Sequence, residues 1–376
     1  MHRHHRRQPG SRPPLVAGLL VALVLASACG PSTSSAPPSQ AAVATPTPTP
    51  SPSPTATPTA TPVPSPTATP TPSTLPGDLT GLPVAPEAAH RLPLAVMIDD
   101  SRQARPQSGF NAASVVYQAT ADGYESRYLL IFQEFDTGDI GPVRSARFFL
   151  VQWAQETRSA LAHYGGDQRT RTYLRWHKKQ YTDVDGLGRG RPAYHRIKTR
   201  RAPHNAYTST KDLRRQADKL GAPEELPADL YRRPFVDASP VAERAASQRI
   251  RVPYHTNVIT YRYDRESNRY RRSIDGKAHV DPADGKRVAP TNVVVLYQRF
   301  RIDTKIEPGH SRPDIKTLGS GKALVFQEGR VIKGTWSKKN DTAPTRITAG
   351  GKDIPLVRGQ TFIQVVPTSA KVTWSD

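Results

Sequence analysis

The sequence predicts an α/β N-terminal domain, with a layered mixed sheet and helices, followed by a β-rich, mostly antiparallel C-terminal domain. Between residues 85 and 235, continuous apolar runs alternate with stretches that carry helix start and stop signals, as in α/β domains. From residue 250 to 376, short β-rich runs are separated by Asp-Gly and Glu-Gly turns, which favour antiparallel strands. Residues 221–249 are rich in proline, alanine and charge and are expected to connect the two.

Residues 1–28 have the pattern of a lipoprotein signal peptide. Residues 1–14 carry four arginines and no acid, residues 15–26 form an apolar run, and small residues follow it. Twelve apolar residues are too few for a transmembrane helix, which needs about 20. Cys29, the only cysteine of the chain, follows in a stretch that resembles a lipobox. We therefore expect Cys29 to be lipidated, with plain secretion as the alternative.

Residues 29–84 are expected to form a disordered stalk that begins at the lipidated cysteine. Residues 31–76 are almost entirely proline, threonine, serine and alanine and contain no charged residue, so they cannot bury enough apolar surface to fold. In an extended polyproline conformation such a segment spans on the order of 140 Å. The sequence thus places a folded module at the outer, extracytoplasmic face of the cell membrane, held away from it by the stalk.

Within the α/β domain, continuous apolar runs predict strands that are covered on both faces. These strands are expected at residues 92–100, 113–120, 127–135 and 160–166, the last with a glycine break. Helices are expected at residues 143–159, opened by Pro142, at 167–176, begun by Asp167, and at 208–221, closed by Gly221. In the C-terminal domain, β-rich runs occupy residues 258–264, 269–275, 279–288, 291–298, 322–336 and 361–366.

The excess positive charge is concentrated in one region. The formal net charge of the chain is +21, and residues 141–217 hold 17 lysine and arginine residues against 5 acidic ones, a local excess of 12. A field of this sign attracts polyanions. Outside a membrane these are anionic wall polymers, phospholipid head groups or extracellular nucleic acid. A solvated basic surface with no specific partner is the alternative.

Several long stretches share their order with a known family. These stretches include LAVMIDDSRQARPQSGFNAASVVYQA, IGPVRSARFF, AHYGGDQ, RRAPHNAYTST and GSGKALVFQEGRVIKGTWSK. Together they resemble the YerB-like family of bacterial lipoproteins over nearly all of residues 90–374. The resemblance implies a two-part extracytoplasmic protein of unknown function, and it supplies no reaction. The text DGYESR at residues 122–127 departs from the family's usual EGGITR-like text.

Arg144 and Arg147 in GPVRSAR are the sharpest candidates for a ligand site. At the start of a helix opened by Pro142 they share one face, where the helix dipole already disfavours cations, so they need a negative partner. Two guanidinium groups there form a bidentate trap for phosphate or carboxylate. Internal pairing is the alternative, and the acids available for it are Asp99, Asp122, Glu125 and Glu134.

Other polar residues are expected at the same rim of the sheet, where strand ends collect ligands. In AHYGG, two glycines after a buried strand allow backbone amides to approach a ligand. The expected ligand-binding residues are Arg105, Arg127, Arg144, Arg147, His163, Gly165, Gly166, His204 and Asn205. If the protein is an enzyme, His204 is the candidate base, with Asp99 or Glu125 as its partner.

No motif identifies a reaction. The chain has no GxSxG elbow, no paired histidine spacing for a metal, and no complete phosphate loop in GLGRGR or GSGK, so no cofactor or metal is expected. The first hypothesis is a lipid-anchored module that binds an anionic envelope glycopolymer or phospholipid head group. The second is a hydrolase or transferase acting on cell-wall polymer, and the third is nucleic-acid capture at the surface. The sequence does not indicate the oligomeric state.

Overall fold

The computed structural model of the chain describes residues 73–227, 230–307 and 309–375. The predicted signal peptide, Cys29 and most of the predicted stalk lie outside these residues. Among the helices in the described ranges, none combines the length and apolarity that crossing a membrane requires.

The folded part begins before residue 85, so the predicted stalk ends too late. Strands β1 (Leu75–Pro76) and β2 (Pro83–Val84) form a hairpin, and helix α1 (Pro86–Ala89) follows it. The buried carboxylate of Glu134 holds this hairpin, because it accepts the backbone N–H groups of Leu79 and Thr80, each at 2.9 Å, and the hydroxyl of Ser114. Glu134 is therefore no partner of the arginines.

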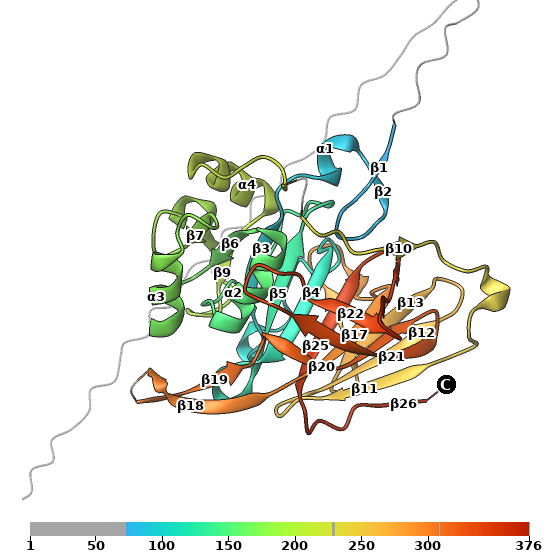
Figure 1. The fold of residues 1–376 in the computed structure, drawn as a ribbon. Coiled ribbons are helices and arrows are strands. Elements are labelled where there is room, and N and C mark those ends of the chain that lie inside the picture. Colours follow the sequence, from blue (N-terminus) through green and yellow to red (C-terminus); the bar gives the residue numbers. More distant parts are fainter. Residues whose placement is uncertain (1–72, 228–229, 308, 376) are drawn as a thin grey trace, which may run out of the picture. The chain divides into compact units, whose positions relative to one another are not determined.

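An 11-stranded mixed sheet runs through both predicted domains. In spatial order its strands are β23 (Lys352–Asp353), β22 (Arg346–Ala349), β21 (Arg330–Lys338), β20 (Gly319–Gln327), β17 (Asn292–Gln298), β25 (Thr361–Pro367), β4 (Val115–Thr120), β5 (Ser126–Phe132), β3 (Leu94–Asp99), β6 (Ala160–His163) and β7 (Asp183–Asp185). The two regions of the chain meet where β25 pairs with β4 in parallel (Figure 1). Every residue of β3 and β5 is buried, in agreement with the apolar runs that predict them.

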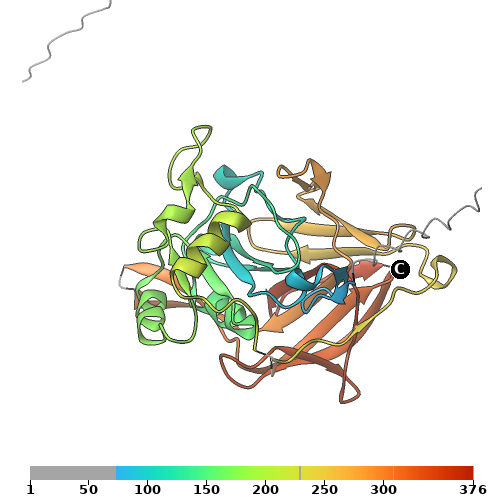
Figure 2. The same ribbon diagram turned by 90° about the horizontal axis from the view of Figure 1, so that it is seen from above.

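A second, antiparallel sheet of five strands comes from the C-terminal region. Its order is β14 (Lys277–Ala278), β13 (Arg269–Ile274), β12 (Val258–Asp264), β11 (Arg249–Pro253) and β26 (Thr373–Ser375). Figure 2 shows the central strands of this sheet, β11, β12 and β13, in yellow, beside the red strands of the main sheet. A further hairpin joins β18 (Phe300–Glu307) and β19 (His310–Ile315), and the sequence did not predict it. The remaining strand pairs are β8 (His195–Arg196) with β9 (Ala206–Tyr207), β10 (Phe235–Val236) with β24 (Leu356–Val357), and β15 (Val280–Asp281) with β16 (Lys286–Arg287).

The N-terminal region has three further helices: α2 (Phe148–Ala154), α3 (Gln168–Trp176) and α4 (Thr210–Lys219). Helices α3 and α4 lie within the predicted ranges, whereas α2 is much shorter than the predicted helix. Asp167 caps α3 by accepting the N–H of Thr170 at 2.8 Å. The long helix predicted at residues 143–159 is wrong, because α2 begins only after Arg147. Residues 143–146 are instead extended, since Arg144 N–H donates to Met97 in β3 at 2.8 Å and Ala146 N–H donates to Gly165 at 2.8 Å.

The two large hydrophobic cores draw on both regions of the chain. In one, side chains of the five-stranded sheet, such as Tyr261, pack against Phe362 of β25 and Leu130 of β5. The other contains Val294 of β17 together with Trp153 of α2, which stacks on Tyr117 of β4 with ring centroids 5.0 Å apart. The coarse prediction of mixed sheets, few helices and a strand-rich C-terminal region is confirmed, but each core depends on contacts between the two regions.

Candidate functional site

The end of strand β3 and the extended segment beside it bring several predicted site residues together. In the register of β3 and β5, Asp99 lies opposite Arg127. The backbone of Arg144 is bound to β3, which places its side chain beside the same carboxylate. We call Arg127, Arg144 and Arg147, with Asp99 and Asp122, the arginine cluster.

Arg147 is neutralised inside the fold. Its Nε donates to Asp122 Oδ1 at 3.0 Å and its Nη2 donates to Asp122 Oδ2, a bidentate pair. Its Nη1 donates to the Ser145 hydroxyl at 2.9 Å and to the Ala146 carbonyl at 2.7 Å. For Arg147, the structure therefore shows the internal pairing that the sequence left open.

Arg144 is only partly neutralised. Its Nε lies 3.1 Å from Asp99 Oδ2, an ion pair without hydrogen-bond geometry. Its side chain is 29% exposed, and within the described residues its terminal nitrogens have no hydrogen bond or ion pair. The fork of this guanidinium group is available to an external acceptor.

Arg127 is buried, with 6% of its surface exposed, and is incompletely satisfied. Its Nη1 donates to the carbonyl and the hydroxyl of Ser145, at 2.8 and 3.2 Å, but its Nε has no hydrogen-bond partner among the described residues. Burial, followed by the positive charge of Arg147, lowers the pKa of Arg127 to about 9, although Asp122 and Asp99 oppose this. Burial of the guanidinium group is thus the main cause of the lowered pKa, and the neighbouring charge of Arg147 adds to it.

Asp122 is the internal anion of the cluster. Besides Arg147 it lies 3.9 Å from Arg127 Nη2 and 3.1 Å from a nitrogen of Arg312 in β19, a residue that the sequence did not indicate. Burial raises the pKa of Asp122. The hydrogen bond and charge of Arg147, with the charges of Arg127 and Arg312, outweigh burial and lower this pKa to about 2. Asp122 is therefore ionised in the folded protein at neutral pH.

His204 lies beside Asp99, as one hypothesis requires. Its Nδ1 donates to Asp99 Oδ2 at 2.7 Å and lies 3.1 Å from the hydroxyl of Ser101. Burial raises the pKa of Asp99, but the Ser101 amide, Arg127, Arg144 and the His204 hydrogen bond together outweigh this and lower it. Because aspartate and serine both face Nδ1, Ser101 is not placed as the nucleophile of a serine triad, which needs the other ring nitrogen.

His163, Gly165 and Gly166 lie next to the extended segment that carries Arg144 and Arg147. His163 is buried, with Nδ1 2.9 Å from the Gly165 carbonyl oxygen and Nε2 2.8 Å from a carboxylate oxygen of Asp183. Burial lowers the pKa of His163, but Asp183 and Asp185 outweigh this and raise it. The sequence predicts that the Gly165 amide can approach a ligand. In the structure this amide instead donates to Asp185 at 2.8 Å. Gly166 forms a bridge with Ala146.

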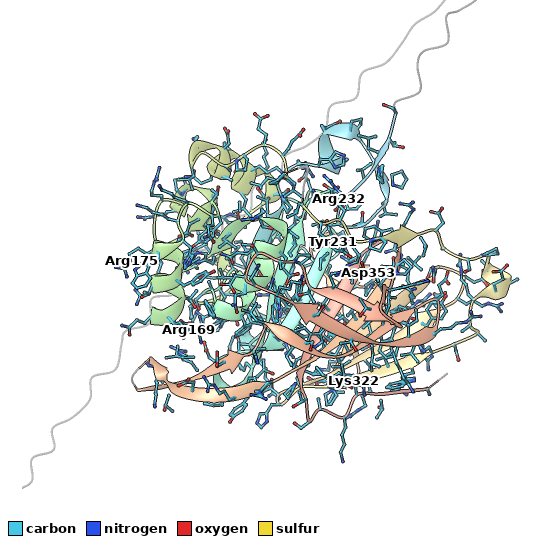
Figure 3. The ribbon with its side chains drawn as sticks, viewed as in Figure 1. Arg169, Arg175, Tyr231, Arg232, Lys322 and Asp353 are labelled. Atoms are coloured by element: carbon cyan, nitrogen blue, oxygen red, sulfur yellow. The ribbon has the colours of Figure 1, made fainter. Side chains whose placement is uncertain are left out.

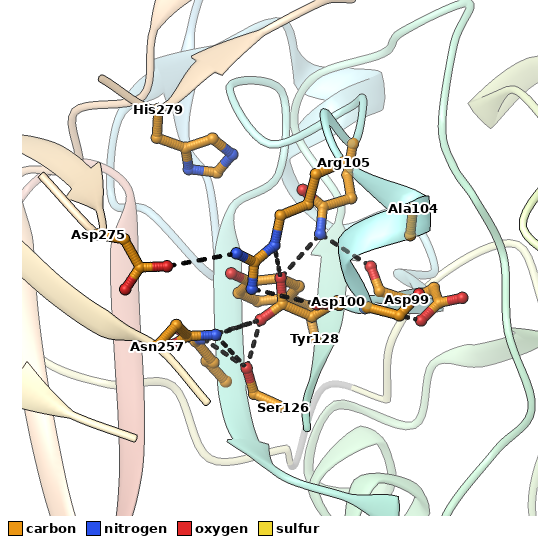
Figure 4. Close-up of polar contacts among 12 residues, drawn as sticks. Asp99, Asp100, Ala104, Arg105, Ser126, Tyr128, Asn257, Asp275 and His279 are labelled. Atoms are coloured by element: carbon orange, nitrogen blue, oxygen red, sulfur yellow. Dashed lines mark hydrogen bonds and ion pairs between the residues drawn. The ribbon is translucent and has the colours of Figure 1, made fainter. Parts of the chain in front are cut away.

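Arg105 belongs to a separate buried group around Asp100 (Figure 4). Its Nε donates to Asp100 Oδ1 at 3.0 Å, and its Nη1 lies 3.7 Å from Asp275 of the C-terminal region. Asp100 Oδ1 also accepts Gln107 at 2.9 Å, and Oδ2 accepts the hydroxyl of Ser126. Arg105 is thus placed as an internal partner of Asp100.

The last two predicted residues lie outside the cluster. Asn205 binds the loop before it, because its Oδ1 accepts Arg196 Nη1 at 2.5 Å and its amide donates to the Ile197 carbonyl at 3.2 Å. The carboxylate of Glu125 makes no hydrogen bond or ion pair within the described ranges, so Asp99, and not Glu125, is the partner of His204. In the described chain, no group of three or more histidine, cysteine, aspartate or glutamate side chains is placed to hold a metal ion.

Comparisons with known proteins agree with this two-part architecture. Residues 79–223 match the family model described as "Protein of unknown function (DUF3048) N-terminal domain", and residues 250–363 match its C-terminal domain. The chain is 33% identical over 298 residues to "Putative lipoprotein YerB" of Bacillus subtilis (strain 168), covering 78% of this chain and 86% of that protein. The crystal structure of YerB protein from Bacillus subtilis matches with a TM-score of 0.70 and 31% identity, covering 80% of this chain and all of that one. The resemblance seen in the sequence is confirmed: this chain belongs to the DUF3048 family, together with YerB.

Proposed function

We propose that this protein is a lipoprotein anchored through Cys29 at the outer face of the cell membrane, and that its arginine cluster binds an anionic group of an envelope glycopolymer or phospholipid head group. The name of its relative and the sequence of residues 1–29 support the anchor. The observation that carries the binding site is the free fork of Arg144, beside the buried Arg127 whose Nε lacks a partner.

The geometry suits a phosphate or carboxylate oxygen. The ion pair with Asp99 keeps the guanidinium group of Arg144 near this position before a ligand arrives, so less side-chain entropy is lost on binding. Arg127 and Arg147, in the same cluster, are buried and have little access to solvent, so their charge interactions are stronger than in water. His204 adds a second polar side chain next to the same carboxylate.

Alanine in place of Arg144 is expected to weaken retention on isolated envelope membranes about tenfold, because a charge-assisted hydrogen bond contributes roughly 1.5–3 kcal/mol. Lysine at this position keeps the charge but not the fork, so an intermediate loss is expected. The measurement is co-sedimentation of the full chain at 50, 150 and 300 mM salt, with Cys29→Ser in every sample so that the lipid does not retain the protein.

Arg175→Ala is the matched control, because Arg175 is an exposed cation on α3 (Figure 3) outside the cluster. Vesicles of anionic phospholipid, and envelopes stripped of their polymer, separate a head group from a glycopolymer as the source of the anion. Equal retention of the Arg144→Ala and Arg175→Ala proteins, both folded, would contradict the proposal.

A hydrolase or transferase acting on cell-wall polymer is a second candidate, favoured by the 2.7 Å contact between His204 and Asp99. The carboxylate holds the proton on Nδ1, which leaves Nε2 to act as a general base. We expect His204→Ala and Asp99→Asn each to abolish release of soluble fragments from purified wall, while circular dichroism shows an unchanged fold. A wild-type protein that releases no fragments from any wall preparation would remove this candidate.

A further inference from the structure

Three neighbouring cavities follow one another along α3, the β18–β19 hairpin and strands β20 and β21. Their volumes are about 510, 610 and 410 Å³. The first and second share Phe148 and Arg169 in their walls, and the second and third share Arg299, Lys316 and Leu318. We call this row of three adjoining cavities the basic groove. No residue of the arginine cluster lines it.

The walls of the basic groove carry more positive than negative charge. Its cationic lining residues are Arg169, Arg299, Arg301, Lys305, Lys316 and Lys322, and its acidic ones are Asp314 and Asp341. Asp314 is shared by Arg169 at 2.8 Å and Arg301 at 2.9 Å. The cavity at the β20–β21 end is lined by three cations and no acid. Figure 3 labels Arg169 and Lys322, which lie at different points along the groove.

Four of these cations have no acidic partner within the described part of the chain: Arg299, Lys305, Lys316 and Lys322. The ammonium group of Lys322 instead lies over the ring of Tyr297, 4.7 Å from its centroid. A lysine or arginine that is not neutralised by its own protein is free to neutralise a ligand, and each such contact with a polyanion releases counterions.

Most aromatic rings of the groove are covered and so do not offer a stacking surface. Arg169 lies over Phe148 at 4.0 Å, His177 stacks on Tyr173 with centroids 4.0 Å apart, and Lys322 covers Tyr297. Trp176, which is 79% exposed, is the exception at one end. Proteins that bind single-stranded nucleic acid stack successive bases on a series of free rings. The described groove favours an anionic chain without bases.

We propose that the basic groove binds an extended polyanion without aromatic bases, a phosphate-linked polyol or sugar polymer of the cell envelope. The inference rests on the proposed location outside the membrane, but not on anion binding at the arginine cluster. The row of cavities, longer than one small anion needs, and the local excess of cations both suit a repeating anionic chain. The polymer would lie across β18, β19 and β20, held mainly by charge.

Binding of poly(glycerol phosphate) to the full chain with Cys29→Ser tests this proposal, measured by fluorescence anisotropy between 50 and 300 mM salt. We expect the triple variant Arg299→Ala, Lys316→Ala, Lys322→Ala to bind at least tenfold more weakly at 100 mM salt. The slope of log K against log salt should fall by about 2, since each contact with a flexible chain contributes roughly 0.7.

The matched control is the triple variant Arg175→Ala, Lys211→Ala, Lys277→Ala, which removes three exposed cations outside the groove and changes the net charge equally. The loss caused by the groove triple variant should be the same factor in the parent protein and in an Arg144→Ala background, which separates failure of this inference from failure at the arginine cluster. Equal affinities of the two triple variants, or tighter binding of oligothymidylate than of a poly(glycerol phosphate) of equal charge, would overturn the proposal.

Discussion

Asparagine in place of Asp122 is expected to destabilise the protein by about 3 kcal/mol at pH 7, because it leaves buried guanidinium groups without their counter-charge. Asp122 is the bidentate partner of Arg147 and also faces Arg127 and Arg312. Phosphate should partly replace the lost carboxylate, and at ten times its dissociation constant it restores about 1.4 kcal/mol. The measurement is urea unfolding with and without phosphate, with chloride at equal ionic strength as the screening control.

The contribution of Asp122 to folding stability should shrink in acid. Its folded-state pKa, about 2, lies below the ordinary value of 3.8, so its contribution is fully present above pH 4 to 5 and is lost as the pH falls towards 2. This difference in pKa corresponds to about 2 kcal/mol. The gap in stability between the parent protein and Asp122→Asn should therefore narrow over that window, whereas Asp218→Asn, at an exposed position of α4, should show no such trend. A gap independent of pH and phosphate would contradict the assigned role.

Asparagine in place of Asp100 is expected to cost about 3–5 kcal/mol of folding stability. The carboxylate of Asp100 is fully buried. Each of its hydrogen-bond partners is a donor, and these partners include Arg105, Gln107 and Ser126 (Figure 4). The amide of asparagine turns one acceptor into a donor that faces other donors, which leaves buried groups unpaired. Because Asn257 also donates to Asp100, at 3.5 Å, the loss should loosen the contact between the two regions of the chain.

Asp275→Asn is the control for this variant. Asp275 faces the same Arg105, but its side chain is 49% exposed and 3.7 Å away, so a loss of less than about 1 kcal/mol is expected. Chemical unfolding followed by tryptophan fluorescence measures both variants, and proteolysis between residues 221 and 249 reports on the contact between the regions. Similar losses for Asp100→Asn and Asp275→Asn would show that the buried network does not have the energetic weight assigned to it.

The sequence predicted those strands that are buried on both faces, because such strands are continuous apolar runs. The runs that became β3, β4 and β5, and the turn at Glu328 and Gly329 between β20 and β21, were recognised in this way. The helix expected from Pro142 was not recoverable, because residues 143–146 bind to β3 and to Gly165, and these pairings are non-local. The pairing of β4 with β25 joins segments from opposite ends of the folded chain and leaves no local signal.

The candidate site was predicted in part. Asp99, Arg127, Arg144 and His204 were all named as site residues, and the structure brings Arg127, Arg144 and His204 around Asp99. The sequence did not show that Arg147 would be matched by Asp122, or that Arg312 of β19 would join that carboxylate. The sequence did not predict the basic groove, because much of its wall comes from the C-terminal region, outside the charge excess at residues 141–217.

The sequence by itself determined the family, the expected lipid anchor at Cys29, and which segments are buried, because these depend on motifs and on local apolar composition. Only the tertiary structure decided which charges remain available to a ligand. Arg144 and Arg147 are three residues apart in the same motif, yet Asp122 neutralises one while Asp99 leaves the fork of the other open. Neutralisation of a charge depends on distances of a few ångströms between residues far apart in the chain, and folding alone sets those distances.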